Sequence, residues 1–169
     1  MKRIAIIAVT YLFLIAGCGF EDHYINIPDN QKPVYQTGDM LIYKSNSGLV
    51  DTLKVGENTD DYRVSDKSYH YERIRTDFYN QGERFSVITM ELNLLKVSWN
   101  GFNLTINELS ANAAKTMVIN NKQVENVFEF TATSYYLSAD TTSKIYYTYK
   151  YGVMKYENKS GAIWELINY

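Results

Sequence analysis

Residues 95–106 read LKVSWNGFNLTI, and this stretch determines the fold class. The Asn100-Gly101 pair is favoured in a two-residue type I′ turn, because both central positions of that turn need a positive φ. A turn there places Trp99 opposite Phe102 and gathers six apolar side chains on one face: Leu95, Val97, Trp99, Phe102, Leu104 and Ile106. The other face carries Lys96, Ser98, Asn103 and Thr105. The stretch therefore predicts an antiparallel hairpin with one buried and one solvated face.

The rest of the chain repeats this pattern of short alternating segments separated by turn residues. Tyrosine is unusually frequent, with 16 residues beside 7 Phe, and aromatic and β-branched residues favour strands. No proline follows Pro33, which suits uninterrupted ladders. We expect a single all-β domain, an antiparallel meander of about nine to eleven strands that forms a curved sheet, sandwich or barrel. We also expect a turn at 58–61 and at most one short helical turn, within 108–115.

The N-terminus has the pattern of a bacterial lipoprotein signal. Two basic residues precede an apolar run from Ile4 to Ile15, and Ala16 and Gly17 lead into Cys18, the only cysteine of the chain. The run is shorter than the roughly 20 residues that a transmembrane helix needs. We therefore predict a signal peptide over 1–17 and lipidation of Cys18, which anchors the protein to a membrane.

Beyond Cys18 we expect a flexible tether over 18–36 and the all-β domain over 37–169. The tether contains both prolines, Pro28 and Pro33, and has no sustained periodicity. With the predicted signal removed, 15 basic side chains stand against 19 acidic ones and form no basic block. This balance argues against DNA or RNA as a partner, because phosphate binding needs clustered Lys and Arg.

Several stretches resemble one family of proteins. They are the lipobox (Leu14–Cys18), the acidic residues after it, and the segments Tyr35–Lys44, Lys144–Tyr147, Tyr151–Val153 and Ile163–Leu166. Together they are similar to small all-β lipoproteins abundant in Bacteroidetes. The resemblance implies lipid anchoring at the outer membrane, with Gly19 fitting outer-membrane retention and Glu21 and Asp22 partly matching a surface-export signal. It implies no activity.

Residue patterns for catalysis, metals and cofactors are missing from the sequence. The two histidines are His23 and His70, and no zinc-protease, calcium-loop or phosphate-loop motif occurs. His70 and Glu72 share one face of a predicted strand, as an acid–base pair does, but a hydrogen-bonded strand histidine is the commoner arrangement. We expect a protein that is not an enzyme and has no metal or cofactor.

Binding of a glycan or a protein is the function that these features favour. Tyr135, Tyr136 and Tyr151 lie near predicted loops, where their rings are free to stack on sugars, whereas Trp99 and Trp164 belong to apolar faces and are expected in the core. The alternative is a periplasm-facing, lipocalin-like or half-barrel carrier of a hydrophobic ligand. Thr52 and Thr141 each sit in a three-residue match to the O-glycosylation signal of Bacteroidetes.

Overall fold

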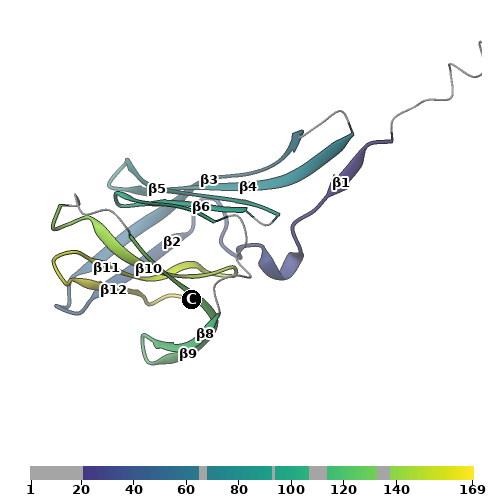
Figure 1. Ribbon diagram of the computed structural model, residues 1–169. Coiled ribbons are helices and arrows are strands. Elements are labelled where there is room, and N and C mark those ends of the chain that lie inside the picture. Colours follow the sequence, from purple (N-terminus) through teal and green to yellow (C-terminus); the bar gives the residue numbers. More distant parts are fainter. Residues whose placement is uncertain (1–20, 65–67, 93, 107–113, 133–137) are drawn as a thin grey trace, which may run out of the picture.

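Eleven strands pair antiparallel in one curled sheet that forms a half-barrel and a single domain (Figure 1). The computed structural model describes residues 21–64, 68–92, 94–106, 114–132 and 138–169. The strands are β2 (Met40–Ser45), β3 (Val50–Val64), β4 (Tyr69–Asn80), β5 (Glu83–Glu91), β6 (Leu94–Trp99), β7 (Phe102–Ile106), β8 (Lys115–Ile119), β9 (Lys122–Thr131), β10 (Thr142–Thr148), β11 (Gly152–Asn158) and β12 (Ile163–Leu166). The all-β fold class is confirmed.

Two meanders make up the sheet. Strands β2 to β7 lie in chain order, strands β12 back to β8 lie in reverse order, and the two runs join where β12 pairs with β2. The predicted hairpin is β6–β7, in which Trp99 pairs with Phe102, Val97 with Leu104 and Leu95 with Ile106. Asn100 and Gly101 have φ of 42° and 79°, so the turn has the expected left-handed backbone.

The expected turn at 58–61 is wrong, because β3 runs through it. A register shift between Val55 and Asn58 absorbs the local irregularity, and the strand continues beside β4 to Val64. The polar residues that suggested a turn lie on an extension of the sheet where strands are largely solvated: Asp61, for example, pairs with Arg73. Most of the helical turn expected within 108–115 falls outside the described residues, and Lys115 begins β8.

The half-barrel is filled by aromatic side chains from both meanders. Trp99 and Tyr43 are fully buried, with ring centroids 5.9 Å apart in an edge-to-face arrangement. Phe78 and Tyr156 approach the Trp99 ring in the same way, at 5.5 and 5.9 Å. Trp164 is half-buried and stacks on Tyr156. Both tryptophans therefore contribute to packing, and Trp99 lies at the centre of it.

Residues 21–36 differ from the flexible tether that we expected. A short strand, β1 (His23–Ile25), pairs parallel with β4, and a 3₁₀ turn, η1 (Asp29–Gln31), follows it. The Ile27 side chain is only 2% exposed, and its N–H donates to the Glu72 carboxylate at 2.6 Å. The ammonium of Lys32 pairs with the same carboxylate. This segment is therefore docked along the sheet.

Candidate functional site

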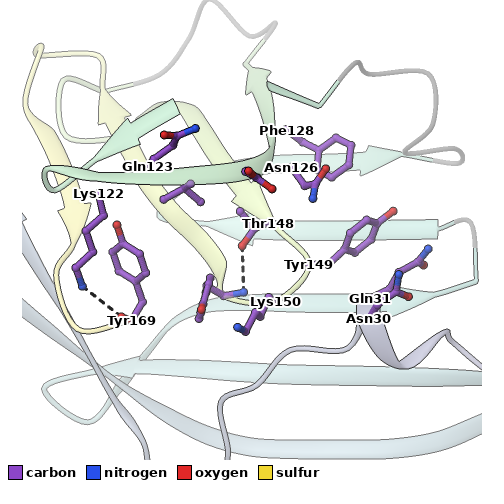
Figure 2. A pocket seen from close by; sticks show the side chains of 13 residues that line it. Asn30, Gln31, Lys122, Gln123, Asn126, Phe128, Thr148, Tyr149, Lys150 and Tyr169 are labelled. Atoms are coloured by element: carbon purple, nitrogen blue, oxygen red, sulfur yellow. Dashed lines mark hydrogen bonds between the residues drawn. The ribbon is translucent and has the colours of Figure 1, made fainter. Parts of the chain in front are cut away.

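A pocket of about 720 Å³ opens beside the second meander, which consists of strands β8 to β12 (Figure 2). Its walls are the first half of β9, the turn between β10 and β11, η1 and Tyr169. Ligand sites commonly have volumes of about 300–1,000 Å³. The pocket thus has the size of a small-molecule or oligosaccharide site, and four segments far apart in the sequence build it.

An irregularity in β9 shapes one wall. β9 pairs with β10 only over 128–131, so its first half and β8 curl away from the main sheet (Figure 1). Asn126 has a φ of 56°, a left-handed conformation that Asn tolerates better than most residues. The strand alternation shifts there, so the consecutive side chains of Val127 and Phe128 are both buried. Figure 2 shows Asn126 and Phe128 on the pocket wall.

Four aromatic rings line the pocket in two pairs. Phe128 and Tyr149 meet edge to face at 5.4 Å, and Tyr151 and Tyr169 meet in the same way at 5.4 Å. The Tyr169 hydroxyl donates to the Ile119 carbonyl at 2.7 Å, which fixes that ring against β8. Burial raises the pKa of Tyr149 and of Tyr169, and the Glu165 carboxylate raises that of Tyr169 further. Both phenols are therefore neutral at physiological pH and offer apolar faces with polar ends.

Amide side chains line the pocket between the rings. They are Asn30, Gln31, Gln123 and Asn126. None of the four forms a side-chain hydrogen bond with any other part of the chain that the structure describes. Each amide carries both donors and an acceptor. The wall can therefore donate to and accept from a ligand rich in hydroxyl groups.

Two lysines flank the second ring pair. The Lys122 ammonium lies 4.6 Å from the centroid of the Tyr169 ring, and the Lys150 ammonium lies 4.8 Å from that of Tyr151. Lys122 also donates to the Tyr169 carbonyl oxygen at 3.4 Å (Figure 2). Cation–π contacts of this kind hold the lysines over the rings, and their ammonium groups have further donors that no described residue accepts from.

Comparison with known proteins adds no assignment to this geometry. No protein-family model, curated protein or solved structure matches the chain. The arguments for function therefore rest on the residues themselves.

One of the three tyrosines proposed for binding lies in this pocket. Tyr151 is half-exposed on the pocket wall, and its N–H donates to the Thr148 hydroxyl at 3.0 Å. Tyr135 and Tyr136 lie outside the described residues, as does Cys18. Binding of a ligand by Tyr151 stays a prediction, and the structure places this residue on a pocket wall.

The two O-glycosylation candidates occupy different settings. Thr52 lies within β3, opposite Ile42 of β2, and is half-buried. Thr141 lies in the loop before β10, where its hydroxyl hydrogen-bonds with that of Ser138 at 2.7 Å. Neither is a freely projecting loop residue, and modification at either position stays a prediction.

His70 and Glu72 do not form an acid–base pair. The His70 ring hydrogen-bonds with Asp22 at 3.2 Å, while Glu72 is buried against Ile27 and Lys32. The described ranges contain no group of three or more His, Cys, Asp or Glu side chains arranged to hold a metal ion. Those ranges also contain no helix with the length and hydropathy of a transmembrane span.

Most of the pocket could not be inferred from the sequence. Phe128 and Tyr149 look like ordinary strand residues, and the amides of η1 and β9 look like loop and surface positions. The one local signal is the tyrosine-rich stretch around 149–151, of which Tyr151 alone was predicted to bind a ligand.

Proposed function

We propose that this protein is a lipid-anchored lipoprotein of the outer membrane or cell surface, and that it binds carbohydrate in the pocket beside β9. The anchor is proposed from the sequence, through Cys18. The observation that carries the binding function is the joint lining of the pocket by aromatic rings and by amide side chains that have no hydrogen-bond partner among the described residues. Tyrosine rings pack against the C–H faces of sugars, and amides exchange hydrogen bonds with their hydroxyl groups.

The alternative of a hydrophobic-ligand carrier finds less support in the described residues. A carrier needs an apolar cavity inside the half-barrel, whereas Trp99, Tyr43, Phe78 and Tyr156 pack ring against ring there. The pocket beside β9 mixes rings with amides and charges and is open to solvent. A sugar suits that lining better than an acyl chain does.

The test is a binding screen with the full-chain lipoprotein in detergent micelles. A panel of neutral and uronic-acid-containing oligosaccharides is screened on an array, and hits are titrated by calorimetry. We expect at least one saccharide to bind, and Tyr151→Ala to weaken binding about 5- to 10-fold, because one ring contact contributes about 1 kcal/mol. Gln123→Ala removes an exposed amide with no described partner and should weaken binding about 5-fold.

A matched control comes from another part of the molecule. Leu49→Ala removes an exposed apolar side chain between β2 and β3 that does not line the pocket, and it should leave the affinity unchanged. If no saccharide binds, or if Leu49→Ala weakens binding as much as Tyr151→Ala, the assignment of carbohydrate to this pocket is wrong.

A further inference from the structure

Exposed rings gather where the described chain begins. There β1 pairs with the first residues of β4, beside the last residues of β3, so that the three strands form a narrow extension of the sheet (Figure 1). We define the aromatic tip as His23, Tyr24, Tyr62, Val64, Tyr69 and His70. Tyr24, Tyr62, Val64 and Tyr69 are 58%, 43%, 58% and 40% exposed and are four of the nine exposed large hydrophobic side chains in the described ranges.

These rings support one another. His23 stacks on Tyr69 with centroids 5.1 Å apart, Tyr24 stacks on His70 at 4.7 Å, and Tyr62 meets the Tyr24 ring edge to face at 5.2 Å. The contacts hold the rings in a fixed array on the surface. An apolar ring body with a polar end is the side-chain type enriched where membrane hydrocarbon meets the headgroups.

Two arginines beside the aromatic tip are paired with carboxylates. Arg73 forms a two-bond ion pair with Asp61, at 2.8 and 2.5 Å, and Arg63 lies 3.7 Å from Glu91. The Arg73 guanidinium holds the pKa of Asp61 below its ordinary value. The β3–β5 side of the aromatic tip therefore presents ion pairs, whereas at the β1 end Glu21 and Asp22 are exposed and Asp22 hydrogen-bonds with His70.

The length of chain before β1 limits where the tip can lie. Cys18 precedes His23 by five residues, and five extended residues span at most about 18 Å. Residues 27–32 add nothing to this distance, because Ile27 and Lys32 are bound to Glu72 of the sheet. If Cys18 carries the lipid, β1 lies within about 18 Å of the membrane surface.

We infer that the aromatic tip lies against the lipid headgroups of the membrane that anchors the protein, and that it sets the orientation of the domain on that membrane. This inference rests on the proposed lipidation of Cys18. The occupant is a phospholipid surface, and the pocket beside β9 takes no part in the contact.

The test places a fluorescent reporter on the tip. Full-chain, lipidated Tyr62→Trp is reconstituted in phosphatidylethanolamine and phosphatidylglycerol vesicles that contain a lipid with a nitroxide on its headgroup. Val118→Trp is the matched control, because Val118 is 68% exposed on β8, away from the tip. Trp99 and Trp164 are common to both variants. We expect the nitroxide to quench the indole introduced by Tyr62→Trp at least twofold more than the indole introduced by Val118→Trp.

Flotation of the same vesicles separates the two proposals. Protein that fails to float refutes the anchor itself. Protein that floats while both variants are quenched equally, or not at all, overturns the contact of the tip with lipid. If the protein sediments as a dimer and its tip is shielded from the quencher, the contact of the tip with lipid is also overturned. The tip is then covered by a second copy of the chain. If Tyr62→Trp loses its β-sheet circular dichroism, Tyr24→Trp replaces it in the same comparison.

Discussion

Replacing Glu72 by Ala should release the N-terminal segment from the sheet without unfolding the half-barrel. The Glu72 side chain is only 2% exposed, and it is the point at which β4 holds both the Ile27 N–H and the Lys32 ammonium. The pKa of the nearby, exposed Asp60 carboxyl is raised, first through partial desolvation and then through the Glu72 charge. Removing Glu72 leaves the Ile27 N–H without its acceptor.

The size of the effect follows from these contacts. A hydrogen bond to a charged acceptor contributes about 1.5–3 kcal/mol. The Lys32 side chain is partly exposed and can turn to water, so the loss of its ion pair adds at most about 1 kcal/mol. We expect docking of the segment to weaken by about 1.5–4 kcal/mol in total. Glu72→Gln, which keeps an acceptor for Ile27 and removes the charge, should have a smaller effect.

Amide hydrogen exchange measures this directly. The His23 N–H donates to the Ser68 carbonyl at 2.6 Å and does not touch Glu72. Glu72→Ala should speed its exchange about 10- to 700-fold, while amides of β6 stay protected. Glu57→Ala, an exposed carboxylate on the neighbouring strand, should change neither. If His23 exchange stays within about threefold of the wild-type rate, the Glu72 contacts do not hold the segment.

Four further substitutions are measured by urea unfolding: two in the core, one in the β6–β7 turn and one in the ion pairs across β8, β9 and β10. Tyr43→Phe should cost about 1 kcal/mol because its hydroxyl donates to a backbone carbonyl at 2.6 Å, whereas Tyr147→Phe should be neutral or stabilising because its buried hydroxyl has no partner in the described ranges; equal costs would contradict this. Gly101→Ala should cost more than about 1 kcal/mol, since φ is 79° and the new Cβ would lie 2.8 Å from the Thr141 methyl; an unchanged midpoint would contradict the turn. Glu129 has its pKa held below its ordinary value by hydrogen bonds from two lysines, so its contribution exists at neutral pH and disappears as pH falls through the lowered pKa. The cost of Glu129→Gln, at most about 1 kcal/mol at pH 7, should therefore shrink below about pH 4, and a cost that stays constant would refute the pairing.

Local chemistry explains what the sequence could predict of the fold. The β6–β7 hairpin was predictable in register because Asn100 and Gly101 specify one turn, and its alternation specifies one face. The pairing of strands that lie far apart in the sequence was not predictable. Nothing in three residues such as His23–Ile25 shows that they join a strand 46 residues away in parallel, and nothing at Glu72 distinguishes a docking carboxylate from a solvated one. The turn expected at 58–61 failed because polar residues also occupy solvated strand extensions.

The candidate site was predictable only where one short stretch supplied it. Tyr151 stood out because turn residues surround it, and it does line the pocket. The opposite walls come from η1, β9 and Tyr169, whose approach depends on the docked N-terminal segment and on the irregular backbone at Asn126. Neither feature has a sequence signature that a single chain reveals.

Residue-level mapping of a bound saccharide tests the pocket assignment most directly. The ¹⁵N–¹H spectrum of the full-chain protein in micelles is recorded while the best-binding oligosaccharide from the screen is added. We predict that the largest shifts come from the amides of 122–128 and 149–151 and from the side-chain amides of Gln31 and Asn126. Shifts confined to the aromatic tip or to the outer faces of β3–β6, or no shifts with any saccharide of the panel, would contradict carbohydrate binding at this site.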